Sequence, residues 1–395
     1  MIYIGSEKLA IFGGNPVFKK KIPILSMIGK EEKEAVFNVL ESGILSQSRQ
    51  GYYVGLFENS FAQYFKNKYA VSTSSGTTAL HTAICTLGIG SDDEVLVPAL
   101  TFVSTASVVL QEGARPVFVD INPDTFNIDM GDLEKKITKK TKAIIIVHLY
   151  GNPNNAIMIE KIAKKYKLII IEDCAQAHGA LFKDEYVGGF GDISCFSFQQ
   201  SKNMICGEGG MVITNNKNLY KKCATIVNHG LINSDLQKYD YDRLGYNYHL
   251  TELQAAIGIE QLKKLKVMNC LRRKNANLYK KYLRDTELIF QKETDNSQST
   301  YYCLTALLPE RFKNKRDWFV EALRAENAEI LRLYPLSLPQ TKLFKRESPI
   351  CPVAMNVSGR LFNFLTNPGI TEEYVKKTCK AVRKVLNYMY EQGAK

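Results

Sequence analysis

From Tyr69 onward, short apolar runs alternate with segments whose apolar residues recur at helical spacing. The runs YAVSTS, EVLVPAL, RPVFVD, KAIIIVHLY, KLIIIEDC, DISCFSF and GGMVITN predict strands. Several are continuous Ile, Val and Leu, which indicates strands buried on both faces. Helical segments between them include Thr78–Leu87, Ser104–Glu112 and Ala156–Tyr166. This alternation predicts an α/β fold with a mostly parallel seven-stranded sheet and helices on both sides.

The flanking segments carry further helical patterns. Gly29–Gly43 predicts an amphipathic helix with Ala35, Val36, Val39 and Leu40 on its apolar face, and Gly43 as its stop. Later segments predict a long helix at Thr251–Leu283, a loop at Gln291–Thr300, a strand at Tyr301–Leu308 and helices at Lys315–Glu326 and Thr371–Tyr390. We expect an N-terminal arm (1–25), a large domain (26–265) and a smaller C-terminal α/β domain (266–395).

Length and composition narrow the class of protein. A chain of 395 residues with 45% hydrophobic residues buries a sizeable core and favours two domains. The net charge of +12 has two interpretations: it reflects a Lys-rich, solvated surface, or it produces a positive electrostatic potential that attracts anionic ligands. Its lysines are dispersed, without a basic stripe of interleaved aromatics, so nucleic acid is not expected as a partner. No apolar run reaches the ~20 residues of a membrane span, and no membrane association is expected.

Cysteine usage bears on the compartment and on metal binding. The nine cysteines form no CxxC pair, and no Cys/His cluster has zinc spacing. No HExxH pattern occurs either, so we expect no metal. Cys174, Cys195 and Cys206 lie in apolar or Gly-rich stretches, where a free thiol packs as a small apolar residue. These features favour a reducing cytoplasm.

Three local features could act together as one chemical site. Ser74–Thr78 (SSGTT) joins a predicted strand to a helix, where free N–H groups can bind a phosphate, although such capped turns are common. Asp173 ends a buried strand, where it could hold a pyridine nitrogen protonated or simply cap a turn. Lys202 follows about thirty residues later, before a Gly-rich strand entry. Taken alone it reads as a surface charge, but this order is the one that a pyridoxal-phosphate (PLP) site on a parallel sheet requires.

At these residues the chain resembles the DegT/DnrJ/EryC1/StrS sugar aminotransferases, a branch of the fold-type I PLP-dependent enzymes. The matching segments are SSGTTAL, PALTFVSTA, ARPVFVD, IIEDCAQAHGA, GDISCFSFQQSKNMICGEGGM and GYNYHLTELQAAIGIEQL. The resemblance implies an aspartate aminotransferase-like fold and PLP as cofactor, in the pyridoxamine 5'-phosphate form between half-reactions. It also implies a homodimer with shared active sites.

The resemblance assigns roles residue by residue. Lys202 forms the Schiff base and exchanges the proton, and Asp173 pairs with the ring nitrogen. The other implied cofactor contacts are Gly76, Thr77 and Ser197 at the phosphate, Phe102 on the ring face, Gln176 at the ring hydroxyl, and Asn247 at the phosphate of the partner subunit's site.

Substrate recognition is less fixed by the resemblance. Candidates are Gln199, Gln200, His178 and His249. His249 stands where many relatives have Arg, and Gln199-Gln200 stands where many have His, as in the branch that aminates cyclitol and aminohydroxybenzoate-type ketones. The donor carboxylate could bind Arg243, Arg332 or Arg360, and the sequence does not choose among them.

The expected function is transfer of an amino group from glutamate or glutamine to a keto sugar, with a nucleotide-linked sugar preferred, in amino-sugar biosynthesis for a surface polysaccharide or a secondary metabolite. The alternative acceptor is a cyclitol ketone such as scyllo-inosose, or the activity is like that of an aminohydroxybenzoate synthase. Two other classes of protein are alternatives. The first is a nicotinamide oxidoreductase, but this chain lacks the GxGxxG fingerprint that such enzymes carry near the first strand. Its Gly188–Gly191 run is interpreted as a turn and does not fit that fingerprint. A non-catalytic ligand-binding protein that kept the fold is the second.

Overall fold

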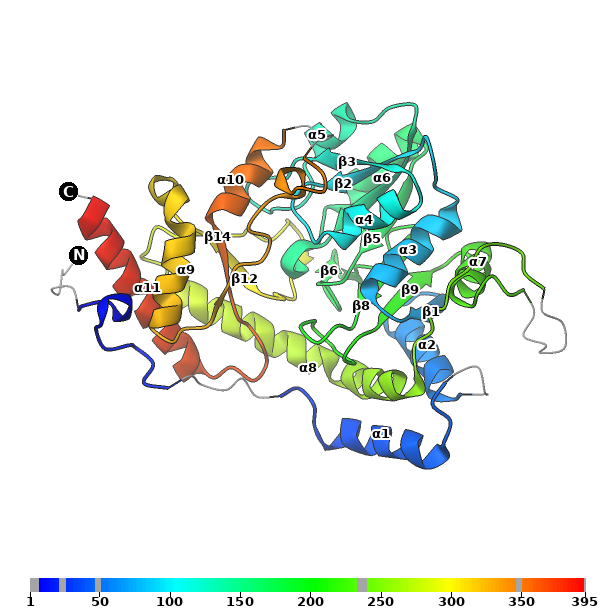
Figure 1. Ribbon diagram of the computed structural model, residues 1–395, viewed down its shortest axis with the longest axis horizontal. Helices are drawn as coiled ribbons and strands as arrows, with labels where there is room; N and C mark the ends of the chain where they lie inside the picture. The colour runs from blue at the N-terminus through cyan, green and yellow to red at the C-terminus, as the bar shows by residue number, and fades with distance from the viewer. Residues whose placement is uncertain (1–6, 21–25, 47–50, 233–239, 346–349, 394–395) are drawn as a thin grey trace.

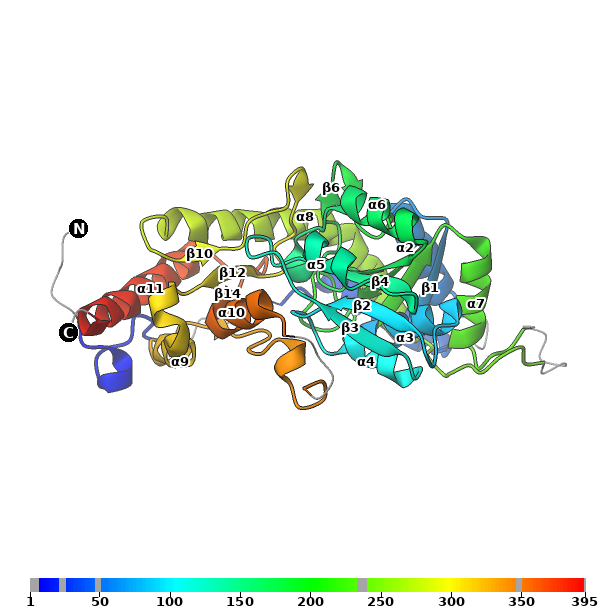
Figure 2. The same cartoon turned by 90° about the horizontal axis from the view of Figure 1, so that it is seen from above.

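The computed structural model describes residues 7–20, 26–46, 51–232, 240–345 and 350–393 (Figure 1). Of the predicted N-terminal arm, residues 1–6 and 21–25 lie outside this part of the chain. Two sheets organise the described residues, a large one built from segments between residues 69 and 214 and a small one built between residues 289 and 364. Figure 2 shows the two regions side by side along the long axis of the molecule.

The large sheet has seven strands in the order β1-β9-β8-β5-β4-β2-β3. Its strands are β1 (Tyr69–Thr73), β2 (Glu94–Pro98), β3 (Arg115–Val119), β4 (Thr141–Val147), β5 (Ile169–Asp173), β8 (Ile193–Ser197) and β9 (Gly210–Thr214). Only β9 runs antiparallel to its neighbours β1 and β8. Each strand lies inside one of the apolar runs or begins one residue before it, so the prediction of a mostly parallel seven-stranded sheet is confirmed.

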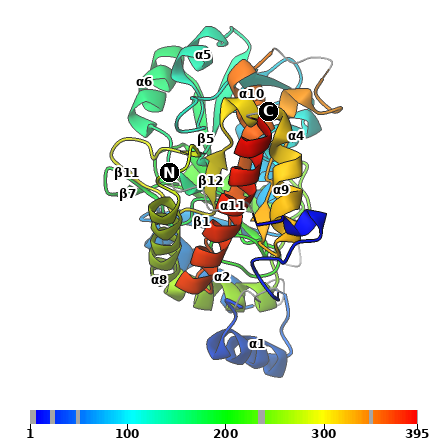
Figure 3. The same cartoon turned by 90° about the vertical axis from the view of Figure 1, so that its left-hand side faces the viewer.

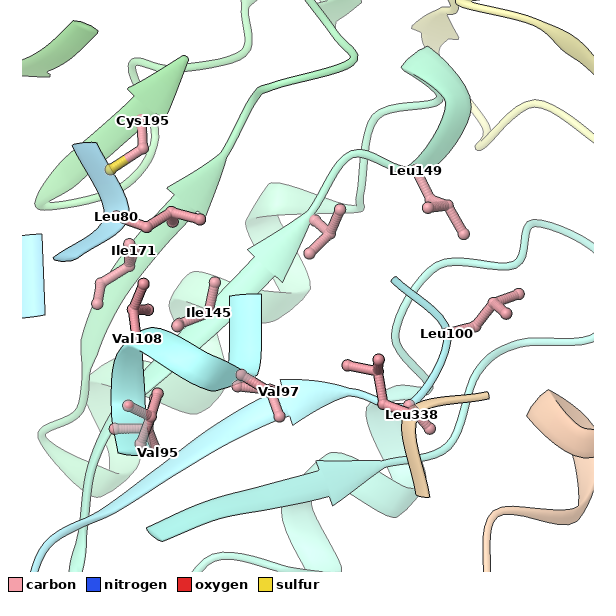
Figure 4. Close-up of a cluster of buried hydrophobic side chains, with 14 of the residues drawn as sticks. Leu80, Val95, Val97, Leu100, Val108, Ile145, Leu149, Ile171, Cys195 and Leu338 are labelled. Carbon is pink, nitrogen blue, oxygen red and sulfur yellow. The ribbon is translucent and has the colours of Figure 1, made fainter. Parts of the chain in front are cut away.

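Helices cover both faces of this sheet. On one face lie α3 (Gly76–Leu87), α4 (Ser104–Gln111) and α7 (Lys217–Val227), and on the other lie α2 (Tyr53–Tyr64), α5 (Met130–Lys135), α6 (Ala156–Tyr166) and α8 (Glu252–Tyr282). Figure 4 shows the core on the first face, where Leu80 of α3 and Val108 of α4 meet strand residues such as Val97 and Ile145. Burial on both faces explains why these strands are continuously apolar.

The C-terminal region is built on a smaller antiparallel sheet of order β10-β12-β14-β13. Its strands are β10 (Ile289–Phe290), β12 (Leu304–Leu307), β13 (Ile330–Leu331) and β14 (Leu361–Phe364). Its helices are α9 (Arg316–Ala325), α10 (Pro352–Arg360) and α11 (Glu372–Gly393), and α9 and α11 lie side by side in Figure 3. A second apolar core joins this sheet to α9, α11 and the end of α8.

Three short strands and four short 3-10 helices complete the described elements. β6 (Leu181–Phe182) pairs with β7 (Glu185–Tyr186) and with β11 (Ser297–Gln298). β11 lies inside Gln291–Thr300, so the prediction of a loop throughout that segment is wrong at these two residues, because they find a partner strand far away in the sequence. The 3-10 helices are η1 (Ala10–Phe12), η3 (Leu149–Gly151), η4 (Glu310–Lys315) and η5 (Leu338–Gln340).

Helix α8 connects the two sheet regions without a break (Figure 1). Thr251 caps its start by accepting a hydrogen bond from the backbone N–H of Gln254. The helix then runs for 31 residues, so the predicted domain boundary at 265/266 falls inside it. The division into domains therefore stays a prediction.

Helix α1 (Lys30–Ser42) packs against α8 and departs from its predicted apolar face. Val39 is fully buried, but Leu40 is 56% exposed. The contacts explain the difference: Glu32 is buried at α8, where Gln261 and Lys264 donate to its carboxylate. Because α1 touches the rest of the described chain mainly through α8, only a narrow strip of it is covered.

The nine cysteines are all free thiols, and seven of them are buried. Among the described helices, none combines the length and apolar character needed to cross a bilayer. Neither observation bears on the site itself, which lies where the two sheet regions meet.

Candidate active site

A cavity of about 770 Å³ opens at the carboxyl ends of the large-sheet strands. Its floor comes from the large sheet and the ends of α3 and α4, and the segment between β13 and η5 closes it from the C-terminal region. Of the predicted residues, those that line it are Gly76, Thr77, Phe102, Asp173, Gln176, Ser197, Gln199, Lys202 and Arg332. Segments far apart in the sequence thus meet at the sheet edge where ligands of open α/β folds bind.

The turn between β1 and α3 presents a helix N-terminus to the cavity. Ser75 caps α3 by accepting a hydrogen bond from the backbone N–H of Thr78. Gly76 allows this turn to approach β8, since a Cβ there would lie 2.5 Å from Cβ of Ser197. Thr77 and Ser104 join their hydroxyl groups at 2.7 Å. N–H groups at a helix start, ringed by hydroxyls, suit a phosphate.

Asp173 lies at the end of β5 and is 6% exposed. Its Oδ2 accepts a hydrogen bond from Oγ1 of Thr105 at 3.0 Å, and its Oδ1 accepts from the backbone N–H of Ala175 at 3.1 Å. Burial raises the pKa of this carboxyl, although those bonds and the charge of Lys202 lower it. A desolvated carboxylate of this kind binds a proton or a cationic ring nitrogen strongly.

Lys202 lies on the loop between β8 and β9, partly buried at the cavity wall. Its Nζ is 5.3 Å from the ring centre of Tyr302. Burial lowers the pKa of Lys202, even though Asp173 favours its charged form. The raised pKa of Asp173 and the lowered pKa of Lys202 agree, since both favour a neutral amine, which is the nucleophilic form of lysine.

Gln176 is buried at 5% exposure and has partners at both ends of its amide. Its Oε1 accepts from the backbone N–H of Tyr150 at 2.7 Å, and its Nε2 donates to the hydroxyl of Tyr334 at 2.6 Å. One N–H of the amide is left for a ligand. Phe102 is 54% exposed on the cavity wall, with its face available to a flat ring.

Four of the predicted residues, apart from the arginines, do not line this cavity. His178 is fully buried between Phe196 and Phe198. Gln200 and Asn247 are exposed, and the partly buried His249 packs near His229 with ring centres 5.7 Å apart.

The three candidate arginines have different surroundings. Arg332 lines the cavity, and its Nη1 lies 2.7 Å from Oδ1 of Asp317. Arg243 pairs with Asp242 outside it. Arg360 is buried, with Nε donating to the carbonyl oxygen of Leu308 at 2.8 Å. Arg332 alone of the three can meet an anion in the cavity.

Sequence reasoning missed Thr105, Tyr302 and Tyr334. Thr105 lies within the PALTFVSTA segment, one helical turn from Thr101, whose hydroxyl it contacts at 3.0 Å. Tyr334 is followed by Pro335 and has φ of 55°, a left-handed backbone that is uncommon for tyrosine. Strain of this kind is invisible in the sequence, so only the Thr105 position carried a local signal.

Among the described residues, two groups of potential metal ligands do not line the cavity: His81, Cys85 and Glu112, and His148, Glu172 and Cys174. Both imidazoles are engaged in hydrogen bonds, since Nε2 of His81 lies 2.8 Å from Glu112 and Nε2 of His148 lies 3.0 Å from Glu172. Glu172 also accepts from backbone N–H groups of the Gly188–Gly191 turn. We interpret both groups as hydrogen-bonded networks. The expectation that the protein binds no metal stays a prediction.

The profile of the DegT/DnrJ/EryC1/StrS aminotransferase family matches residues 26–383. The chain is 37% identical over 369 residues to GDP-perosamine synthase of Escherichia coli O157:H7, covering 92% of this chain and 98% of that protein. It is 38% identical over 321 residues to UDP-N-acetyl-3-dehydro-alpha-D-glucosamine 3-aminotransferase of Acidithiobacillus ferrooxidans, covering 81% and 85%. It is 37% identical over 320 residues to L-glutamine:2-deoxy-scyllo-inosose aminotransferase of Streptomyces kanamyceticus, covering 77% and 74%.

Solved structures share the architecture. S. venezuelae DesV in complex with a ketimine intermediate superposes with a TM-score of 0.83 at 30% identity, covering 89% of this chain and 93% of DesV. A GDP-4-keto-6-deoxymannose-3-dehydratase with a trapped PLP-glutamate geminal diamine gives 0.85 at 29% identity, covering 91% and 99%.

Proposed function

We propose, since this chain belongs to the DegT/DnrJ/EryC1/StrS aminotransferase family, that it uses PLP to aminate a nucleotide-linked keto sugar with glutamate or glutamine as donor. The family establishes that the protein is an aminotransferase. The observation that carries the proposal is the meeting of Lys202, Asp173 and the start of α3 in one cavity.

The residues present fit PLP. The start of α3, with Gly76 and Thr77, and Ser197 on β8 would hold its phosphate, because the close approach of Gly76 to Ser197 leaves a cradle of N–H and hydroxyl groups. Asp173 would face the ring nitrogen, and Phe102 would cover the ring. The free N–H of Gln176 would reach the ring hydroxyl. When bound, the ring accepts the electron pair left on the substrate carbon.

Lys202 would supply the proton transfer. Its amine is neutral more often than a surface lysine, because burial lowers its pKa. A neutral Nζ can hold the cofactor and can then take a proton from the substrate carbon and return it. Asp173 keeps its carboxylate fixed through Thr105 and Ala175 while this happens.

Two observations favour a nucleotide-linked acceptor. Relatives of this chain include enzymes named for GDP- and UDP-linked sugars, and the alignments with them cover 92% and 81% of this chain. The net charge of +12 and Arg332 in the cavity suit an anionic ligand. The alternative, a cyclitol ketone, is supported by the relative named for 2-deoxy-scyllo-inosose and by the Gln199–Ser201 loop beside Lys202. The free thiols fit the reducing cytoplasm.

We also infer a homodimer with shared sites. Asn247 is exposed and does not line the cavity of its own chain. The rings of its neighbours Tyr246 and Tyr248 stack on each other with centres 4.9 Å apart, and both contact the ring of His81 edge-on. Alternation along the extended backbone therefore directs Asn247 to the opposite side. Exposed apolar side chains on α1 and at the cavity, among them Phe37, Leu40 and Phe102, suit burial by a second copy.

An acceptor panel tests the substrate. The purified protein, supplied with PLP and glutamate or glutamine, is assayed with nucleotide-linked keto sugars and with free inosose-type ketones at several salt concentrations. The proposal expects turnover of a nucleotide-linked sugar with a KM that rises with ionic strength, because salt screens exposed charge pairs beyond about 8–10 Å. Turnover of free cyclitol ketones alone, with a salt-independent KM, would establish the alternative.

A further inference from the structure

The side-chain amide of Gln176 is held at both ends by tyrosine residues. Its Oε1 accepts a hydrogen bond from the backbone N–H of Tyr150 at 2.7 Å, and its Nε2 donates to the hydroxyl oxygen of Tyr334 at 2.6 Å. Because a backbone N–H can only donate, the amide oxygen must face Tyr150 and the amide nitrogen must face Tyr334. The orientation of the amide is thereby fixed, and one N–H of Nε2 remains at the cavity wall.

Both tyrosines have a backbone conformation that is uncommon for their residue type. The φ angle is 59° at Tyr150 and 55° at Tyr334, in the left-handed region, and Tyr334 also precedes Pro335, which restricts its backbone further. Such conformations are costly, persist only where the surrounding structure enforces them, and cluster at functional sites. Here both strained residues contact the same amide at the cavity wall.

The hydroxyl of Tyr334 is held in place through its own backbone and ring. On the preceding residue, the backbone N–H of Leu333 donates to Oδ1 of the buried Asn363 at 2.9 Å. The ring of Tyr334 stacks on the fully buried ring of Tyr150, with centres 5.8 Å apart and planes inclined by 24°. The hydroxyl therefore has a defined position relative to Gln176.

One anchor alone would leave the amide of Gln176 free to turn. With only the bond from Tyr150, Nε2 could swing about the fixed Oε1. Gln176 is 5% exposed, so an N–H that lost its partner would be costly and the amide would turn to find another one. The bond to Tyr334 occupies one of the two N–H groups and so sets the direction of the other.

We propose that Tyr334 is a positioning residue: its hydroxyl, together with the backbone N–H of Tyr150, orients the Gln176 amide so that the remaining N–H binds the ring hydroxyl of the cofactor. This inference rests on the proposed function, in which Gln176 meets that hydroxyl. It gives the segment between β13 and η5 a part in recognising a cofactor that is otherwise held by the large sheet.

The binding of two probes to the full chain, freed of cofactor, tests this without an enzyme assay. One probe is pyridoxamine 5'-phosphate, which forms no bond to lysine, and the other is its 3-deoxy analogue, which lacks only the ring hydroxyl. Equilibrium dialysis gives a Kd for each. The ratio of the two Kd values isolates recognition of the ring hydroxyl, because the phosphate and ring contacts are common to both probes.

Three variants are compared with wild type by this ratio. Tyr334→Phe removes the hydroxyl and keeps the stacked ring, so it should fold, and thermal unfolding checks that it does. Gln176→Leu shows the ratio without the amide. Tyr166→Phe is the matched control, since the hydroxyl of Tyr166 donates to Glu134 at the exposed end of α6.

Wild type and Tyr166→Phe should bind pyridoxamine 5'-phosphate about tenfold more tightly than the analogue, as one hydrogen bond provides. The ratio should fall to about threefold or less in Tyr334→Phe and to about one in Gln176→Leu. An unchanged ratio in Tyr334→Phe overturns the proposal, since a tyrosine that only packs would weaken the binding of both probes alike.

A ratio of one in wild type overturns the proposal as well. Should Tyr334→Phe not fold, the ratio in Tyr334→Met decides in the same way, because methionine also lacks the hydroxyl. Failure of the wild-type chain to bind either probe has a different meaning: it contradicts the proposed function itself, on which this inference rests.

Discussion

Thr105 donates its hydroxyl hydrogen to Oδ2 of Asp173 at 3.0 Å, so α4 fixes the carboxylate that ends β5. The partner oxygen, Oδ1, is held by the backbone N–H of Ala175. Both of these hydrogen bonds come from neutral donors. Among the described residues, no arginine or lysine is hydrogen-bonded to the Asp173 carboxylate. The charge of Asp173 is therefore available to a cationic group in the cavity.

Asp173→Asn should fold like wild type, because the side chains have the same shape, but should lose at least 100-fold in kcat. This loss corresponds to about 2.7 kcal/mol of barrier. The amide cannot hold the proton of the ring nitrogen as the buried carboxylate does. Steady-state kinetics at saturating cofactor measure the loss, and thermal unfolding checks the fold. Thr105→Val, which removes only one hydrogen bond, should lose about tenfold or less. Near-wild-type turnover of Asp173→Asn would contradict this role.

Arg332→Met should raise the KM for the anionic substrate about tenfold, equal to about 1.4 kcal/mol, and leave kcat nearly unchanged. The guanidinium lies in the cavity, and Asp317 only partly offsets its charge because Arg316 pairs with the same carboxylate. The matched control is Arg243→Met, since Arg243 pairs with Asp242 away from the cavity. Equal KM values for Arg332→Met and wild type, for both donor and acceptor, would rule out this arginine as an anion contact.

His178 should make the protein sensitive to acid. Burial and the charge of Lys202 lower its pKa in the folded state to about 3, whereas an unfolded histidine titrates near 6.5. Between these values the unfolded chain binds a proton that the folded chain does not, so stability falls as pH drops from about 6.5 towards 3, by up to ~1.4 kcal/mol per pH unit. His178→Leu should flatten the Tm-versus-pH curve in that window. Replacement of the exposed His229 by Leu is the control, and an unchanged slope in His178→Leu contradicts the assignment.

Mixed subunits test the shared site. Lys202→Ala and Asn247→Ala homodimers should each have low activity. After dissociation and reassembly of an equal mixture, about half of the dimers are hybrids, and one of the two sites in each hybrid regains both residues. About a quarter of the wild-type activity should therefore return. Activity no greater than the mean of the two parents would mean that Asn247 serves its own chain or no site at all.

The large sheet was predictable because its strands are buried on both faces and so carry continuous apolar runs, as in KAIIIVHLY. The exposed part of α1 was not predictable, because the elements that pack around a helix decide how much of its apolar stripe is covered, and Leu40 stays 56% exposed. Similarly, α2 and α10 were missed, since their mixed patterns lack clear boundaries.

The active-site residues also fall into a predictable group and an unpredictable group. Asp173, Lys202 and the SSGTT turn follow strands or precede a helix, so the topology that brings them together is legible in the sequence. Tyr302 and Tyr334 reach the cavity from segments at least 100 residues beyond Lys202, and no local pattern marks that contact. His178 was expected near the cavity because it follows Asp173, but the turn closed by the bond from Ala177 N–H to Cys174 O directs it into the aromatic core.

The central claim is that Lys202 carries the cofactor. The protein reconstituted with PLP is reduced with borohydride, digested, and mapped by mass spectrometry. The account predicts one phosphopyridoxyl group, on the peptide that contains Lys202, and none in Lys202→Ala, which should still bind PLP through the phosphate and ring contacts. A stoichiometric adduct on any other lysine, or an equal yield in Lys202→Ala, would contradict it.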